Sequence, residues 1–292
     1  MHLSLKNKTD EITAMEIKSL KGIDISSIVE AFNKSFSDYV IKLSFNEENF
    51  QRKIDAENIK LEYSPAAFVN GEIVGFILNG LDEINGVKTV FNGGTGVVPE
   101  HRGQRIVQKL YDYILPILKE EGYRHHQLEV FAGNDKAEKS YENVGFSRVK
   151  EIAAFKGTVA EYAADGIVLK EVKGIDWDVA NSFFDIVPTW QNSTSSVLRA
   201  IDKLKIVVAY KDNNLAGYVV YDPIAKRIKQ FAVKKEERNK GIGKTLFSYV
   251  NNAVGEVSFT NYDLSDTKAI TFFKELGLNQ YFESYEMKLL LK

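Results

Sequence analysis

A basic, glycine-bearing loop is the part of this sequence whose residue types most directly suggest chemistry. The loop runs from Arg238 to Lys244 and reads Arg-Asn-Lys-Gly-Ile-Gly-Lys, between an apolar run at 228–233 and helically spaced apolar residues at 245–254. A helix start carries free N–H groups and a partial positive charge, which suits an anion. Glycine lets the backbone approach that anion and adopt positive φ. The order strand, loop, helix therefore predicts a phosphate-binding turn, and a plain turn with a basic rim is the alternative.

The glycine spacing distinguishes this loop from two common phosphate-binding motifs. A Walker loop requires GxxxxGK[ST], and here Lys244-Thr245 follows glycines that lie too close together. A dinucleotide-binding turn requires GxGxxG, whereas the pattern here is Arg-x-x-Gly-x-Gly. The loop therefore matches neither motif.

Composition excludes several classes of protein. The chain has 292 residues, which is room for two domains, and its 44% hydrophobic and 27% charged content is typical of a soluble globular protein. A net charge of −2 gives no electrostatic support for a nucleic-acid partner. The absence of cysteine excludes disulfides, thiolate metal sites and a cysteine nucleophile.

Histidines and apolar runs also carry little functional signal. The four histidines show no metal-ligand spacing, so no metal is expected; they are His2, His101, His125 and His126. No apolar run approaches the length of a membrane span, and the N-terminus has no signal-type apolar region. We therefore expect a cytoplasmic protein with no membrane partner.

The elements that must position the loop occur in two similar series. The first comprises strands near 14–20, 66–69, 73–78, 87–98, 127–131 and 147–155 and helices near 24–34, 47–58, 106–121 and 135–143. The second comprises strands near 167–172, 205–210, 215–221, 227–233, 257–262 and 281–291 and helices near 177–186, 195–204, 245–254 and 268–276.

Subtraction of residue numbers supports a tandem duplication. Arg238 follows Arg102 by 238 − 102 = 136 residues, and Gly277 follows Gly145 by 277 − 145 = 132. Two units offset by about 135 residues are each large enough to hold a core. We predict an N-terminal domain at 1–156, a linker at 157–166 and a C-terminal domain at 167–292.

Each unit resembles the GCN5-related N-acetyltransferase (GNAT) family across nearly its whole length. One motif is the acyl-CoA loop, Arg/Gln-x-x-Gly-x-Gly/Ala, complete at 238–243. The other is clearest in the first unit, as Asn134-x-x-Ala137-x-x-x-Tyr141-x-x-x-Gly145-Phe146. The resemblance implies an α/β (mixed α+β) protein with two tandem GNAT folds, each a splayed mixed sheet flanked by helices. Acetyl-CoA is then expected where two central parallel strands part.

The resemblance also implies a mechanism and residues for it. A primary amine attacks the thioester directly in a ternary complex, and a base must take its proton because an amine is mostly protonated at neutral pH. A backbone N–H near Val97 or Val233 would stabilise the carbonyl oxygen. Tyr141 matches the tyrosine that protonates the leaving thiolate in many members. Glu129 is either a base facing the cleft or a solvated residue.

The two units carry complementary departures from the family pattern. In the first, Arg105 and Val107 replace the two loop glycines, and Val107 would be strained by about 1–3 kcal/mol if its position needs positive φ. In the second, Phe273 replaces the tyrosine and cannot donate a proton. We favour the first unit as the catalytic one. The second unit would then either bind acetyl-CoA in a structural role or form one wall of the substrate cleft. The opposite assignment stays open.

Expected coenzyme contacts follow from the loop and from the strand before it. In the first unit they are Val97, Val98, Arg102, Gly103, Gln104, Arg105, Ile106, Val107 and Asn134. In the second they are Val233, Arg238, Asn239, Lys240, Gly241, Ile242, Gly243 and Lys244. Asn134 could equally form a plain turn. Asn92, Gly93 and Gly94 interrupt the preceding strand and predict a bulge next to a ligand.

The predicted function is acetyl transfer from acetyl-CoA to a primary amine, and the acceptor stays open between a small molecule and a peptide amine. Asp82 and Glu83 mildly favour a cationic small molecule, whereas Phe36, Tyr39 and Phe45 hint at an apolar wall. Peptidoglycan-bridge aminoacyl transferases share the tandem fold but carry a helical insertion that has no counterpart here. A non-catalytic acyl-CoA sensor or scaffold is the rival reading. The sequence does not indicate an oligomeric state.

Overall fold

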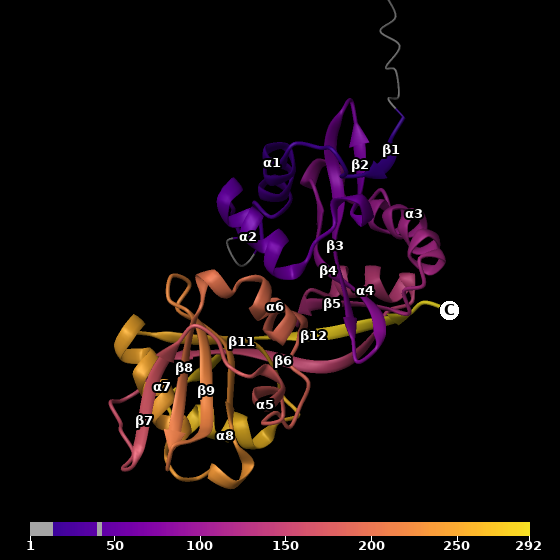
Figure 1. The fold of residues 1–292 in the computed structure, drawn as a ribbon. Helices are drawn as coiled ribbons and strands as arrows, with labels where there is room; N and C mark the ends of the chain where they lie inside the picture. Colours follow the sequence, from indigo (N-terminus) through magenta and orange to yellow (C-terminus); the bar gives the residue numbers. More distant parts are fainter. Residues whose placement is uncertain (1–13, 40–42) are drawn as a thin grey trace, which may run out of the picture.

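A single mixed sheet of twelve strands runs through the part of the chain that this computed structural model describes, residues 14–39 and 43–292 (Figure 1). The strands are β1 (Glu16–Ser19), β2 (Pro65–Val69), β3 (Glu72–Ile84), β4 (Val87–Val97), β5 (His125–Phe131), β6 (Ser147–Gly157), β7 (Ile167–Val172), β8 (Lys205–Lys211), β9 (Asn214–Asp222), β10 (Arg227–Val233), β11 (Val257–Asp263) and β12 (Asn279–Leu290). Their order across the sheet is β1-β2-β3-β4-β5-β12-β6-β11-β10-β9-β8-β7.

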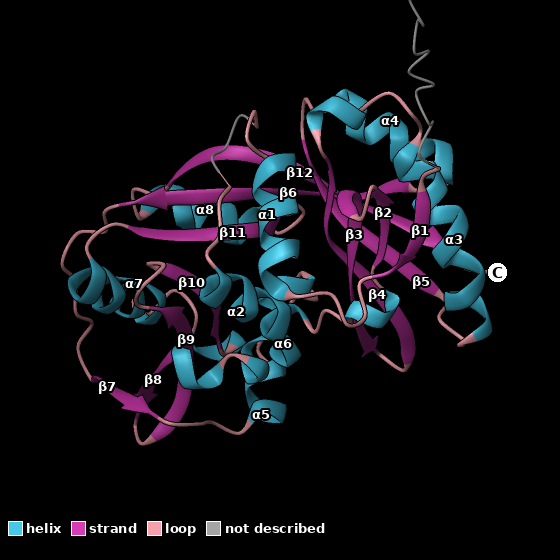
Figure 2. Ribbon diagram, turned by 90° about the horizontal axis from the view of Figure 1, so that it is seen from above, coloured by secondary structure: helices cyan, strands magenta, loops and turns pink. Residues whose placement is uncertain are grey.

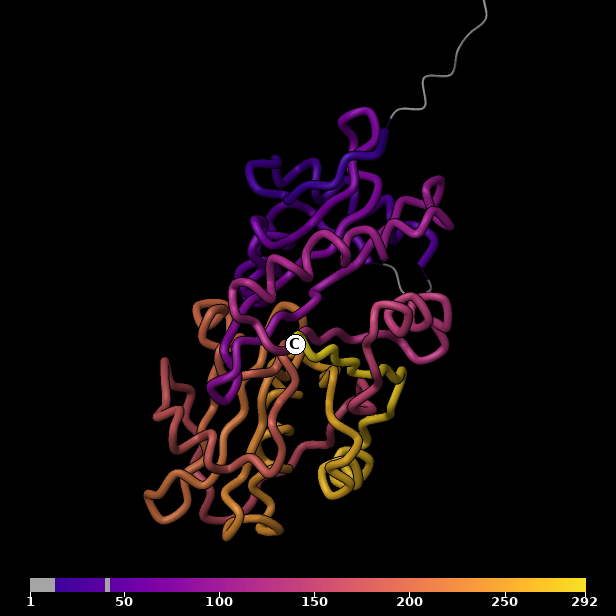
Figure 3. Tube along the Cα trace, turned by 90° about the vertical axis from the view of Figure 1, so that its right-hand side faces the viewer, coloured from indigo at the N-terminus to yellow at the C-terminus, as the bar shows by residue number. Residues whose placement is uncertain are grey.

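This order shows that the two units exchange their last strands. The C-terminal strand β12 lies antiparallel between β5 and β6, and β6 lies antiparallel between β12 and β11. Each unit thus fills a gap in the sheet of the other, and the two long strands run side by side across the junction (Figure 1). Figure 3 shows the first half, mostly in indigo and magenta, above the second half in orange and yellow, and Figure 1 shows that the described chain ends beyond β5 and α4, on the side of the first half. The predicted boundaries at 156 and 167 stay a prediction, because the strand pairings cross them.

Helices cover both faces of each half. They are α1 (Ile25–Ser35), α2 (Glu47–Glu57), α3 (Ile106–Glu120), α4 (Asp135–Val144), α5 (Trp177–Asn181), α6 (Thr194–Arg199), α7 (Ile242–Val254) and α8 (Thr267–Glu275). In the first half α3 and α4 pack on one core and α1 and α2 on another. In the second, α7 and α8 share a core and α5 and α6 share the other. Figure 2 shows α2 beside α6.

Apolar residues at helical spacing explain these cores. Leu110, Ile114 and Leu118 of α3 are fully buried, and burial of each stabilises the fold by about 1.5–3 kcal/mol. Two expected helices are shorter than their sequence patterns: α5 ends at Asn181, not near residue 186, and α6 ends at Arg199, not near residue 204. Beyond α5, the carbonyl of Phe183 and the carboxylate of Asp185 accept hydrogen bonds from the Arg238 guanidinium.

The central strands part in both halves. β4 and β5 pair in parallel only as far as Asn92↔Leu128, and β10 and β11 only at Arg227↔Ser258 and Ile228↔Phe259. The predicted bulge lies at Gly93, where the β3–β4 register shifts. A Cβ on Gly93 would lie 2.4 Å from the Glu57 carboxylate, so a larger residue here would displace the Glu57 side chain. The splayed mixed sheet expected from the family resemblance is confirmed.

Candidate active site

A cavity of about 1650 Å³ lies in the first half, where β4 and β5 part. It is bordered by the ends of these strands, the starts of α3 and α4, the segment after α1, and β12 from the second half. Eight of the site residues predicted from the sequence line this cavity: Val97, Arg102, Gly103, Arg105, Ile106, Val107, Asn134 and Tyr141. Val98, Gln104 and Glu129 are not part of that lining.

The two glycine-type loops follow the same backbone path. Arg102 and Arg238 both have φ −68° and ψ 159°. Arg105 adopts φ 56° and ψ 31° where Gly241 has φ 79° and ψ −4°. The left-handed conformation costs a non-glycine residue about 1–2 kcal/mol. The strain considered for Val107 is therefore misplaced: Val107 lies within α3, and the residue that takes positive φ is Arg105.

The start of α3 offers an anion-binding turn to the cavity. Arg105 gives it no side-chain cap, and the first intrahelical bond runs from the Lys109 N–H to the Arg105 carbonyl, 3.1 Å. The N–H groups of Ile106 and Val107 precede this bond and have no partner within the helix. With the cations of Arg105 and Lys136 on the same cavity, this turn fits a pyrophosphate.

The first arginine of each loop is held by other groups of the protein. Arg102 donates to the Asp38 carboxylate at 2.6 and 2.9 Å, to the Ser35 carbonyl at 2.9 Å and to the Val97 carbonyl at 3.1 Å. These hydrogen bonds hold the pKa of Asp38 below its usual range. Arg238 makes the same pattern with Asp185 and two carbonyls. Both guanidinium groups therefore fix the loop against the preceding segment.

The backbone of Val97 is oriented to receive a carbonyl oxygen. The Val98 N–H donates to the Val74 carbonyl of β3, 2.9 Å. Because successive residues of a strand point their N–H groups to opposite edges, the Val97 N–H points away from β3, toward the side that β5 has left. Val97 is thus available as an N–H donor, and Val98 is not.

Tyr141 on α4 lies between the core and the cavity. Its side chain is 8% exposed and packs against Tyr111 and Phe146. Burial raises the pKa of Tyr141 to about 12, so its hydroxyl stays protonated at neutral pH. Asn134 caps α4 by accepting from the Ala137 N–H at 3.2 Å and donates to the Tyr39 hydroxyl at 3.1 Å. Tyr141 therefore presents a proton donor at the point where the strands part.

Aromatic rings fill the corresponding space in the second half. Phe231 and Phe272 stack with their centroids 5.7 Å apart. A Cβ on Gly243 would lie 2.9 Å from Phe272 Cζ and 3.1 Å from Phe231 Cζ. The counterparts in the first half, at offsets of 231 − 95 = 136 and 272 − 140 = 132, are Thr95 and Ser140, which line its cavity. The complete glycine loop thus belongs to the half with the filled cleft.

The segment at 158–166 also covers the second loop. Tyr162 and Ala164 donate their N–H groups to the Ser248 and Thr245 hydroxyls of α7 at 2.9 and 3.0 Å. A Cβ on Gly241 would lie 2.7 Å from the Tyr162 hydroxyl, and the Lys244 ammonium lies 4.4 Å from the Tyr162 ring centroid. This segment, expected to be a linker, therefore occupies the surface beside the second glycine turn.

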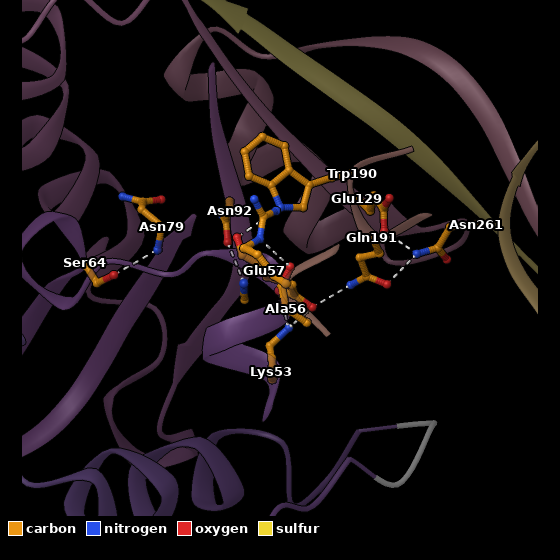
Figure 4. Close-up of polar contacts among 12 residues, drawn as sticks. Lys53, Ala56, Glu57, Ser64, Asn79, Asn92, Glu129, Trp190, Gln191 and Asn261 are labelled. Atoms are coloured by element: carbon orange, nitrogen blue, oxygen red, sulfur yellow. Dashed lines mark hydrogen bonds and ion pairs between the residues drawn. The ribbon is translucent and has the colours of Figure 1, made fainter. Parts of the chain in front are cut away.

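Glu129 lies in a polar cluster at the junction of the halves (Figure 4). Its carboxylate accepts from Asn261 Nδ2 at 2.7 Å, and Gln191 of the second half joins Asn261 to Glu57 of α2. Burial, followed by the charges of Glu286 and Glu57, raises the pKa of Glu129 to about 8. Asp82 lies nearby and pairs with Arg199 at 2.8 Å. Asp82 thus joins the halves.

Replacement of Glu129 by glutamine should flatten the pH dependence of stability. A folded pKa of about 8 means that the folded protein binds more protons than the unfolded chain above the ordinary carboxyl pKa. The free energy of unfolding therefore falls as pH rises from about 4.5 to about 8. We expect Glu129→Gln to stabilise the protein at pH 8 by about 1–3 kcal/mol. Urea unfolding at pH 5 and pH 8 measures this, with exposed Glu62→Gln as control; parallel profiles for variant and wild type would contradict it.

Residues 14–39 and 43–292 contain no helix that is both long and apolar enough to cross a bilayer. The same described residues hold no group of three or more histidine, aspartate or glutamate side chains arranged for a metal ion. Of the four histidines, His2 lies outside the described residues, and His126 is buried beside Tyr111 and Phe146 in the first core.

Family models match both halves. Residues 25–146 match the acetyltransferase (GNAT) family, and residues 202–278 match an acetyltransferase (GNAT) domain. The tandem arrangement expected from the sequence is confirmed. A search of curated protein sequences finds no match.

Solved structures share the fold across nearly the whole chain. A tandem GNAT protein from the clavulanic acid biosynthesis pathway superposes with a TM-score of 0.72 at 14% identity, over 96% of this chain and 99% of that one. A GCN5-related N-acetyltransferase from Sphaerobacter thermophilus gives 0.72 at 15% identity, over 95% and 96%. A glucosamine N-acetyltransferase region of a fungal multi-domain β-N-acetylglucosaminidase gives 0.74 at 14%, over 95% and 38%. At these identities the likeness establishes the fold alone.

Proposed function

Because this chain belongs to the acetyltransferase (GNAT) family, we propose that it transfers an acetyl group from acetyl-CoA to a primary amine in the cavity of its first half. One observation favours the first half over the second as the site of this reaction. The space beside Thr95 and Ser140 is open, whereas the equivalent space beside Phe231 and Phe272 is filled by their stacked rings.

The residues of the first half suit acetyl-CoA as a substrate. The α3 start and the cations of Arg105 and Lys136 match a pyrophosphate at one end of the cavity. The Val97 N–H then donates to the thioester carbonyl, where negative charge develops during attack. The amine nitrogen forms a bond to the acyl carbon, the carbon–sulfur bond breaks, and Tyr141 protonates the departing thiolate. The proton lost by the amine passes to solvent or to a base, for which Glu129 remains a candidate.

The second half has a structural role in this proposal. Its strand β12 completes the first sheet and supplies Tyr281, Phe282 and Glu283 to the cavity lining. Its own loop is covered by Tyr162, and its cleft holds Phe272 and Phe231. Residues 238–244 would then hold the fold of the second half and bind no coenzyme.

Calorimetry and a thiol assay test the proposal together. Titration of acetyl-CoA into the wild-type protein should give one site per chain. Incubation with acetyl-CoA and a panel of primary amines should release free thiol only when an amine is present. Two equivalent binding sites would overturn the assignment to the first half. Binding without thiol release for any amine would overturn acetyl transfer and favour the acyl-CoA sensor.

A further inference from the structure

Five aromatic side chains form a continuous row along one side of the cavity. Neighbouring ring centroids lie 5.4 Å apart for Phe36 and Tyr39, 5.8 Å for Tyr39 and Phe131, 5.0 Å for Phe131 and Phe282, and 4.7 Å for Phe282 and Tyr281. We call these residues the aromatic wall. All five line the cavity and none is fully buried, so their rings are available to a ligand.

The aromatic wall lies on the opposite side of the sheet from Tyr141. Leu128 and Val130 of β5 pack on the core beneath α3 and α4. Because side chains alternate along a strand, Phe131 points to the other face, where α1 and α2 lie. The anion-binding turn and Tyr141 belong to α3 and α4. The cavity therefore passes between the parted strands, with a basic end on one face and an aromatic end on the other.

Charge at the aromatic end is sparse. Asp38 lines the cavity but is paired with Arg102 at 2.6 Å. Glu283 of β12 is exposed and accepts a hydrogen bond from Gln280 at 2.5 Å. An acceptor with several ammonium groups needs several carboxylates, which the described lining does not offer. A single ammonium beside an aromatic body does fit, because rings bury apolar surface, stack with other rings and attract a cation over their faces.

We infer that the acceptor is a small primary amine that carries an aromatic group, held between Tyr39 and Phe131 of the first half and Phe282 of the second. The inference rests on the proposed acetyl transfer and adds the class of its acceptor. It also gives β12 a direct part in substrate choice, since Phe282 comes from the last strand of the chain. Ring stacking orients the amine so that its nitrogen reaches the gap beside Val97.

Matched amines test this assignment. Initial rates of thiol release at fixed acetyl-CoA are compared for 2-phenylethylamine, ethylamine and spermidine. We expect kcat/KM for 2-phenylethylamine to exceed that for each of the others at least tenfold. Phe282→Ala should lower kcat/KM for 2-phenylethylamine, mainly through KM, about tenfold more than it lowers kcat/KM for ethylamine. Phe282→Tyr should restore most of the loss, and exposed Leu290→Ala on the same strand should change nothing.

The possible outcomes distinguish a failure of the aromatic-acceptor inference from a failure of the proposed acetyl transfer. Equal kcat/KM for the three amines, a preference for spermidine, or an equal effect of Phe282→Ala on all of them would overturn the aromatic acceptor while acetyl transfer stands. Absence of thiol release with every amine, despite bound acetyl-CoA, would instead overturn the proposed transfer reaction.

Discussion

Replacement of Tyr141 by phenylalanine should lower kcat for acetyl transfer by about 10²–10⁴ and leave the Kd for acetyl-CoA within about twofold. The substitution removes one hydroxyl from a side chain that lines the cavity, and it keeps the ring packed against Tyr111 and Phe146. Without that hydroxyl the thiolate leaves unprotonated. Thiol release at saturating acetyl-CoA and amine measures kcat, and calorimetry measures Kd.

The pH profile adds a readout that a structural role would not move. The pKa of Tyr141 is raised to about 12 by burial, so loss of its proton should not limit kcat below about pH 11. A fall of wild-type kcat near pH 9–10 that disappears in Tyr141→Phe would contradict the raised pKa of Tyr141. A kcat for Tyr141→Phe within about twofold of the wild type would contradict its role as the acid. Tyr113→Phe on α3 is a suitable control, because Tyr113 packs against the same core and does not line the cavity.

Replacement of Val107 by tryptophan should weaken acetyl-CoA binding at least about 100-fold, which corresponds to about 2.7 kcal/mol. Val107 is partly exposed at the start of α3, where it packs at the edge of the core and lines the cavity, so an indole there blocks the turn. Lys240→Trp places the same ring on the exposed second loop and should leave binding unchanged.

Calorimetry of the two variants decides between the halves. If Lys240→Trp abolishes binding and Val107→Trp does not, the intact glycine loop is the coenzyme site and the assignment to the first half is wrong. Urea unfolding should place Val107→Trp within about 1 kcal/mol of the wild type, because position 107 borders the cavity and only the edge of the core. This comparison separates a blocked site from a damaged fold.

The sequence predicted the elements and the duplication because both depend on local patterns. Apolar spacing defined α3 and α7, and the motifs repeated at fixed offsets. The filled cleft was in principle readable as well. Phe231 and Phe272 stand where the first half has Thr95 and Ser140, and large rings at both positions indicate a closed space.

Other features depend on three-dimensional context. That Arg105 accepts the left-handed conformation follows from the packing of the turn, and nothing in its residue type indicates it. The engagement of Arg102 by Asp38 joins residues 64 positions apart, so a phosphate contact seemed equally reasonable. Membership of Phe282 in the first cavity depends on the pairing of β12 with β5, and strand partners distant in sequence cannot be read from alternation alone.

The exchanged strands determine when the first half can become complete during synthesis. Glu129 of β5 faces Glu286 of β12, 286 − 129 = 157 residues later. At translation rates of about 5–20 residues per second, synthesis of the intervening residues takes about 8–30 seconds, during which β5 has no β12 to pair with. Until then the nascent first half exposes the free edge of a central strand, and its aromatic wall lacks Phe282. A chain that stops before the last strand therefore lacks both the closed sheet and the complete aromatic wall, because both depend on residues 278–292.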